Sequence, residues 1–198
     1  MIYAGCHLSN SAGNVAMVKT ALDIGANTFA FFTRNPRGSR AKAEDPADCA
    51  QAVAMLREYN FGKLVAHGAY TMNLCTADPE ARAFASDILA DDLRRMASMP
   101  GNFYNFHPGS HVGQGVEAGI GYIADALKKA LSHGYPVTVL LETMAGKGRS
   151  WQAQVCHASS QSLCYIPDCG LLQLQHSYRH VWQLYSTKDS IHPIRLLQ

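Results

Sequence analysis

Three residues of the kinds that bind metal ions stand at the ends of three apolar segments. His67, His107 and Glu142 each close such a run, and the runs are spaced at regular intervals along the chain. Two imidazoles and one carboxylate form a standard zinc ligand set that leaves a position open for water or substrate. A carboxylate can also bridge two metal ions and so clamp both oxygens of a phosphodiester under attack. One histidine at a strand end is more often a hydrogen-bonded core residue, but three residues at equivalent places favour a metal site.

Other polar and aromatic residues accompany these three. The segment T-R-N-P-R-G-S-R-A-K (residues 33–42) carries four basic residues, and it is either solvated surface or a binding site for a phosphate-bearing substrate. Tyr70 either packs against the protein or presents its ring to an unstacked nucleotide. His111 either holds a turn or touches substrate. His7 closes the first apolar segment, where we expect it to support the metal ligands from outside the metal's own coordination sphere.

An alternation of strands and helices must position these residues. The expected strands are Ile2–His7, Thr28–Phe32, Lys63–His67, Asn102–His107 and Pro136–Glu142. Helices are expected from Ser11 to Gly25, from Asp78-Pro79-Glu80 onward, and over Val116–Ser132, where apolar residues recur every three or four positions. Strands separated by helices pair in parallel through βαβ crossovers. Because the carboxyl ends of such strands meet at one face of a barrel, we expect the three metal-ligand candidates to converge there.

The alternation stops after Gly148. From Arg149 onward the chain has a single glycine, Gly170, and no strand–helix pair can be recognised. We therefore predict a partial barrel over residues 1–148 and a poorly structured or aberrant tail over residues 149–198. The tail is a divergent subdomain, a disordered extension or a segment read in another frame, and the abrupt break favours the last of these.

Composition narrows the class of protein. The chain has 198 residues, of which 47% are hydrophobic and 16% charged, with a formal net charge of +2, as in ordinary globular proteins. Nucleic-acid binding would therefore need a local basic patch. No apolar stretch is long enough to predict a membrane span, and the start M-I-Y-A-G-C lacks the features of a secretion signal. The six cysteines are irregularly placed, which favours reduced thiols over a disulfide framework. We therefore expect a cytoplasmic protein, or a nuclear or mitochondrial one in a eukaryote.

Five segments carry a resemblance to a known family. They read G-C-H-L-S, F-F-T-R-N-P-R, A-H-G-A-Y-T-M-N-L, N-F-H-P-G-S-H and L-L-E-T-M-A-G-K-G, in this order within residues 1–148. Together they resemble endonuclease IV, the zinc-dependent apurinic/apyrimidinic endonuclease of DNA base-excision repair. The resemblance implies a (β/α)8 TIM barrel, here reduced to its first five strands and an irregular tail. It also implies three zinc ions in the complete family site and a monomer that binds double-stranded DNA containing abasic sites.

The same resemblance implies an activity and assigns residues to it. Members of the family cut the phosphodiester on the 5′ side of an abasic site with a zinc-bound hydroxide, leaving a 3′-hydroxyl and a 5′-deoxyribose phosphate. His67 and His107 match two ligands of one zinc ion, and Glu142 matches the catalytic carboxylate that bridges it to a second. Arg37 matches the basic residue that enters the DNA near the lesion. Tyr70 matches the aromatic residue that helps to hold the strands apart.

The chain departs from the family pattern in two ways. Thr71 stands where the family often has a bulky apolar wedge, and the segment with the remaining metal ligands has no counterpart. A full barrel needs roughly 250 residues, so we expect at most one well-formed zinc site and little or no activity. Two other interpretations stay open. One is a sugar isomerase or epimerase on the same barrel type, which would have little need of Arg37 and Tyr70, and the other is a non-catalytic fragment that binds DNA.

Overall fold

A parallel sheet of five short strands forms the centre of the protein. The structure, a computed structural model, describes residues 2–142 and 183–184. The strands of this sheet are β2 (His7–Leu8), β3 (Ala30–Phe32), β4 (Val65–His67), β5 (Phe103–Phe106) and β6 (Thr138–Leu141). They lie side by side in chain order, and every neighbouring pair is parallel. A helix lies between each strand of this sheet and the next, which is the building pattern of a (β/α) barrel.

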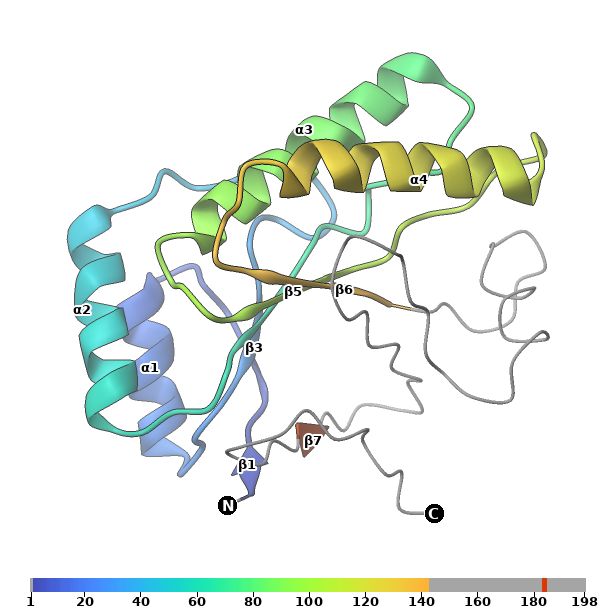
Figure 1. Cartoon of the computed structure of the whole chain (residues 1–198). Helices are drawn as coiled ribbons and strands as arrows, with labels where there is room; N and C mark the ends of the chain where they lie inside the picture. Colours follow the sequence, from blue (N-terminus) through green and yellow to red (C-terminus); the bar gives the residue numbers. More distant parts are fainter. Residues whose placement is uncertain (1, 143–182, 185–198) are drawn as a thin grey trace, which may run out of the picture.

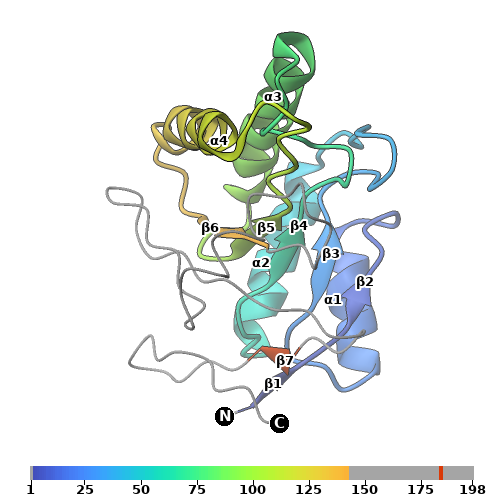
Figure 2. The same ribbon diagram turned by 90° about the vertical axis from the view of Figure 1, so that its right-hand side faces the viewer.

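Four helices cover one side of this sheet (Figures 1 and 2). They are α1 (Asn14–Asp23), α2 (Pro46–Glu58), α3 (Pro79–Met96) and α4 (Val116–Leu131). The carboxylates of Asp45 and Asp78 accept hydrogen bonds from the first amides of α2 and α3, and a proline follows each cap. The start of α1 is capped from another helix, since Asp48 accepts hydrogen bonds from the amides of Asn14 and Val15.

The hydrophobic core lies between the sheet and the helices. Tyr104 and Phe106 of β5 and Leu89 of α3 are 0% exposed, and they belong to one cluster that includes residues of all four helices. Burial of each large apolar side chain stabilises the fold by about 1.5–3 kcal/mol. The helices therefore hold the strands in register, and the register fixes where the strands end.

The observed elements follow the expected ones closely, with one correction. The expected strand Ile2–His7 is divided, because β1 (Tyr3–Ala4) pairs antiparallel with β7 (Gln183–Leu184), and only β2 joins the parallel sheet. Gly5 separates the two strands, and its backbone lies so close to the carbonyl group of Thr28 that a side chain there would overlap it. The strand is thus interrupted at Gly5 and Cys6, where a continuous strand was expected.

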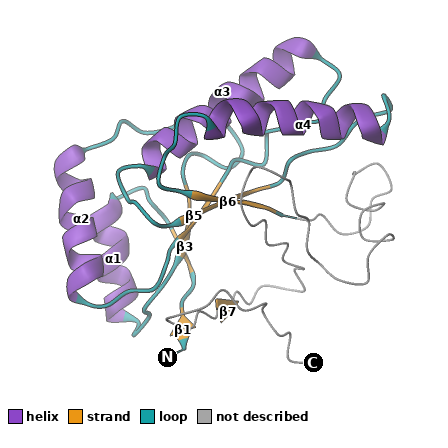
Figure 3. Ribbon diagram, viewed as in Figure 1, coloured by secondary structure: helices purple, strands orange, loops and turns teal. Residues whose placement is uncertain are grey.

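The other expected strands and the three expected helices are present (Figure 3). Helix α2 was not expected, although Asp45-Pro46 at its start is the same N-terminal signal as Asp78-Pro79. The predicted boundary near residue 148 and the predicted tail lie outside the described residues, apart from β7. In the described part, every helix is too short or too polar to span a membrane.

Candidate metal centre

His67, His107 and Glu142 lie together at the carboxyl ends of three neighbouring strands. His67 is the last residue of β4, while His107 and Glu142 directly follow β5 and β6. One possible ligand atom from each residue lies within 4.8 Å of the other two. The parallel pairing of the three strands brings their ends level, as the alternation of strands and helices predicts.

The contacts of His67 place an acceptor at each nitrogen of its ring. Nδ1 lies 2.7 Å from the carbonyl oxygen of Gly68, and Nε2 lies 3.0 Å from Oε2 of Glu142. A neutral imidazole carries one proton, and if Nδ1 donates it to the carbonyl, the lone pair of Nε2 faces a carboxylate oxygen. Only a proton or a cation between these two atoms makes the contact favourable. A ring that donates from one nitrogen to a backbone carbonyl is typical of a metal-ligating histidine.

Glu142 is 7% exposed and is held in its ionised form. Burial alone would raise the pKa of its carboxyl group, but the hydrogen bond with His67 and the nearby His107 lower the pKa below its usual value. Nδ2 of Asn105 also donates a hydrogen bond to Oε2 of Glu142, at 2.6 Å. The carboxylate is therefore both charged and fixed in orientation.

Asn105 is a site residue that the sequence analysis did not single out. It stands two positions before His107, and residues two apart in a strand point to the same face. Its side chain is 6% exposed and reaches the carboxylate of Glu142. The spacing of two residues between Asn105 and His107 in N-F-H was the sign in the sequence that their side chains point to the same face.

His107 offers a neutral ring to the same site. Burial lowers its pKa from 6.5, and the nearness of His67 acts in the same direction, although the carboxylate of Glu142 acts in the opposite one. Its Nδ1 is buried and has no hydrogen-bond partner among the described residues. Two imidazoles, one of them kept neutral, and one ionised carboxylate fit a zinc ion.

Tyr70 lies against the two histidines. Its ring is stacked on that of His107, with centroids 5.9 Å apart, and meets His67 edge-on at 5.6 Å. The side chain is nevertheless 58% exposed, so one face of the ring is accessible. The amide of Tyr70 donates to the carbonyl oxygen of Pro36 at 2.9 Å, which brings the neighbouring Arg37 to the same end of the sheet.

Two other histidines considered for the site, His7 and His111, lie outside the group of three. The ring of His7 contacts Phe32 at 4.7 Å, and Phe32 in turn contacts His67 at 5.1 Å, so His7 is one residue removed from the metal-ligand candidates. Nδ1 of His111 accepts a hydrogen bond from the amide of Gly113 at 3.2 Å. Of the two roles considered for His111, this contact favours holding the turn.

The turn between His107 and His111 is built around Gly109. Gly109 has a φ of 104°, and a Cβ on it would overlap the side chain of Asn73. Asn73 fastens this turn, because its Oδ1 accepts from the amide of Ser110 and its Nδ2 donates to the carbonyl of Ser110, both at 3.1 Å. The Pro-Gly corner thus fixes the chain directly after a candidate ligand.

We expect the substitution Gly109→Ala to weaken zinc binding by about tenfold or more, since backbone strain of this kind costs about 1–3 kcal/mol and Asn73 must also move. Gly113→Ala is the matched control, because Gly113 has a similar φ of 106° but nothing within 4 Å of an added Cβ. Zinc affinity and thermal unfolding of both variants separate strain alone from displacement of Asn73. Equal effects in the two variants would contradict this account of the turn.

We also expect zinc affinity to fall at acid pH, since the ring of His107 must be neutral to bind a metal ion. The folded-state pKa of His107 lies below its ordinary 6.5, so its neutral form is favoured in the folded protein. The associated stability is therefore present above pH 6.5 and is lost as the pH falls toward the lowered pKa. Competitive zinc titration across this range measures the effect, with His133→Ala as a control. A flat pH profile would argue against histidine ligands.

Comparison with known proteins places the chain in a family. A family model described as "Xylose isomerase-like TIM barrel" matches residues 18–160. A "Probable endonuclease 4" from Akkermansia muciniphila is 57% identical over 148 residues, which are 75% of this chain and 53% of that protein. A second, from Alkaliphilus oremlandii, is 55% identical over the same shares. The chain thus spans about half the length of the curated relatives that it matches.

Solved structures give the same assignment. Endonuclease IV from Thermus thermophilus is similar with a TM-score of 0.63 and 33% identity, over 77% of this chain and 55% of that chain. D-psicose 3-epimerase from Clostridium cellulolyticum has a TM-score of 0.53 at 12% identity, over 70% and 52%, which is a likeness of fold alone. The resemblance to endonuclease IV and the TIM-barrel fold class are confirmed. This chain belongs to the family of xylose isomerase-like TIM barrels.

Proposed function

We propose that this chain carries the metal-binding part of a DNA repair endonuclease that cuts the phosphodiester on the 5′ side of abasic sites. The observation that carries the proposal is the convergence of His67, His107 and Glu142 beside the exposed ring of Tyr70. The 57% identity to a probable endonuclease 4 over 148 residues supports it. Cleavage of this kind leaves a 3′-hydroxyl and a 5′-deoxyribose phosphate.

His67, His107 and Glu142 are the residues that would hold the zinc ion. When bound, such an ion lowers the pKa of a coordinated water and neutralises charge on a phosphate oxygen. Asn105 keeps the carboxylate of Glu142 oriented, and the carbonyl of Gly68 keeps the ring of His67 in place. Residues that hydrogen-bond to metal ligands in this way raise metal affinity.

Arg37 and Tyr70 are the residues that we assign to the DNA. Arg37 is exposed, and its guanidinium group makes no hydrogen bond or ion pair within the described part of the chain, so its charge is available to a phosphate. The accessible face of Tyr70 can stack on a base or sugar displaced from the duplex. Thr71 offers no bulky apolar group, and we therefore assign strand separation to Tyr70 alone.

We propose that the activity is impaired. Among residues 2–142 and 183–184 there is one group of three possible metal ligands, enough for one zinc ion but not for a cluster of three. Clamping a phosphodiester between metal ions requires at least two of them. We therefore expect the chain to bind abasic duplex and to cut it slowly. We also propose that it is a cytoplasmic monomer.

The experiment is incision of a duplex with a single abasic site by the purified chain, with and without a zinc chelator. We expect slow nicking that leaves a 3′-hydroxyl and that is lost on chelation and in Glu142→Gln. Zinc content is measured on the same samples. A zinc-loaded protein that neither binds nor nicks the abasic duplex would contradict the proposal.

The same samples test the two alternatives. Binding of abasic duplex that survives chelation, without a nick, would identify a non-catalytic DNA-binding fragment. Metal-dependent isomerisation of a free ketose, with no affinity for DNA, would identify a sugar isomerase or epimerase. The exposed, uncompensated Arg37 favours the nuclease, because a small neutral sugar has no phosphate for it to bind.

A further inference from the structure

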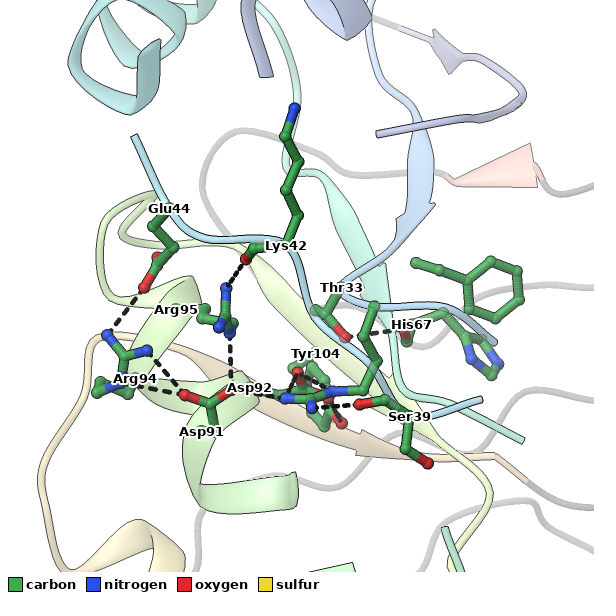
Figure 4. Close-up of polar contacts among 12 residues, drawn as sticks. Thr33, Ser39, Lys42, Glu44, His67, Asp91, Asp92, Arg94, Arg95 and Tyr104 are labelled. Atoms are coloured by element: carbon green, nitrogen blue, oxygen red, sulfur yellow. Dashed lines mark hydrogen bonds and ion pairs between the residues drawn. The ribbon is translucent and has the colours of Figure 1, made fainter. Parts of the chain in front are cut away.

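A buried arginine lies at the base of the loop that carries Arg37. Arg34 is the second residue after β3 and is only 7% exposed. Its Nε and Nη2 donate hydrogen bonds to Oδ1 of Asp92 on α3, at 2.9 and 2.7 Å, and Nη2 also donates to Asp91 at 2.7 Å. Figure 4 labels both aspartates, together with Tyr104 and Ser39. Asp92 is 0% exposed. Burying a pair of charges is unfavourable unless their geometry is good, and this pair has several short bonds.

Further contacts fix both ends of this ion pair. Tyr104 of β5 donates from its hydroxyl to Oδ2 of Asp92 at 2.7 Å, so the carboxylate is held from the sheet as well. Asp91 also accepts from Arg95, whose Nη1 donates to the carbonyl of Lys42 at 2.8 Å. Both the beginning and the end of the basic loop are therefore fastened to α3.

Arg34 also shapes the loop itself. Its Nη1 donates to the carbonyl oxygen of Ser39 at 2.9 Å, and Ser39 has a φ of 55°. A residue other than glycine adopts this conformation only where surrounding contacts over-determine it. Because the guanidinium group spans from α3 to this carbonyl, it holds residues 34–39 in a closed turn with Arg37 at the outside.

The closed turn is joined to the loop that carries Tyr70. The hydroxyl groups of Ser39 and Thr71 are 2.5 Å apart, and the amide of Tyr70 donates to the carbonyl of Pro36 at 2.9 Å. The side chains of Arg37 and Tyr70 thus sit on two loops that are bonded to each other. Within residues 34–39 and 70–71, the charged group that ties these loops to α3 is the guanidinium group of Arg34.

We propose that Arg34 is a positioning residue for DNA recognition. Anchored on Asp92, it holds the loops of Arg37 and Tyr70 as one preformed surface, which reduces the entropy lost when DNA binds. The inference rests on the proposed function, since its ligand is a duplex with an abasic site. Arg34 itself is too buried to reach a phosphate, so its effect must pass through Arg37 and Tyr70.

The experiment compares Arg34→Lys with the wild-type chain, both loaded with zinc. Lysine keeps the charge but cannot bond Asp92 and Ser39 together, because it is a point charge on a flexible stem. We expect affinity for a duplex with an abasic analogue to fall about tenfold, with zinc affinity unchanged. The slope of log affinity against log salt should fall by about one in Arg34→Lys, and by the same amount in Arg37→Ala, since a phosphate contact would be lost in each.

Amide hydrogen exchange gives a readout that does not depend on DNA. The amide of Asn35 donates to the carbonyl of Arg40, and the amide of Tyr70 donates to Pro36, so both report on the closed turn. We expect faster exchange at Asn35 and Tyr70 in Arg34→Lys and not in Arg40→Lys, which changes an exposed residue of the same loop. If Arg34→Lys does not fold, Thr71→Val removes the contact between the loops at the surface and is tested in the same two ways.

The outcomes separate this inference from the proposed function. A wild-type chain without preference for abasic duplex overturns both. A wild-type chain that binds, with Arg34→Lys or its substitute Thr71→Val unchanged in affinity, salt slope and exchange, overturns the inference alone. A loss of zinc affinity equal to the loss of DNA affinity also overturns it, because the effect would then pass through the metal centre.

Discussion

Replacing Glu142 with glutamine is expected to lower the zinc affinity of the chain at least about 100-fold and to abolish incision. Even residues that only hydrogen-bond to metal ligands affect metal affinity by about 10- to 100-fold, so loss of a charged ligand must exceed that. Glutamine keeps the size of the side chain and an oxygen that accepts from Asn105. The substitution therefore removes the charge while leaving the packing near β5 in place.

The measurements are a competitive zinc titration and thermal unfolding in the presence and absence of a chelator. Because a ligand that binds only the folded state stabilises it, chelation should lower the midpoint of unfolding of the wild type and leave that of Glu142→Gln nearly unchanged. Glu117→Gln, on the exposed side of α4, is the matched control and should behave as the wild type. A zinc affinity in Glu142→Gln equal to that of the control would remove Glu142 from the ligand set.

The metal-ligand candidates could be found from the sequence because their positions follow from topology. His67, His107 and Glu142 each end a strand, and parallel strands in chain order bring such ends to one face. No distance had to be known for this step. Whether these three residues bind zinc stays a prediction, but their convergence within 4.8 Å does not depend on any assumed ion.

The Arg34 network could not be found in the same way. Arg34 stood among several basic residues of one loop, and nothing in its neighbours distinguishes it from Arg37, although one is 7% exposed and the other lies at the surface. Its partner Asp92 is far along the chain, on a helix whose expected start was at Asp78. Which acidic residue faces a given loop depends on the packing of α3 against the sheet, and a single sequence carries no local signal of it.

The division of the first strand shows a similar limit. An apolar run such as Ile2–His7 satisfies the pattern of a strand, but the pattern says nothing of which partner each part of it pairs with. Gly5 was the visible signal, since glycine inside a strand often marks a close approach of another backbone. The backbone that approaches Gly5 is that of Thr28, and the sequence does not show that these two residues lie together.

Replacing Arg34 with methionine is expected to reduce the free energy of unfolding by about 3–5 kcal/mol, the range found when one member of a buried ion pair is removed. The reason is Asp92, which would remain 0% exposed without a cation beside it. Arg94→Met is the matched control, because Arg94 pairs with Asp91 and Glu44 at the surface with 51% of its side chain exposed. Loss of such a surface pair changes stability by about 1 kcal/mol or less.

Two further measurements identify the buried charge as the cause. In the double variant Arg34→Met/Asp92→Asn, the carboxylate is replaced by a neutral group that still accepts from Tyr104, so part of the lost stability should return. Burial already raises the pKa of Asp92, against the effect of Arg34, and without Arg34 the rise is larger. The deficit of Arg34→Met is then present above the folded-state pKa of Asp92 and shrinks as the pH falls below it, because protonation neutralises the buried group. Denaturant unfolding at several pH values tests this sign, and a deficit that is constant with pH would mean that packing of the arginine stem, and not its charge, stabilises the loop.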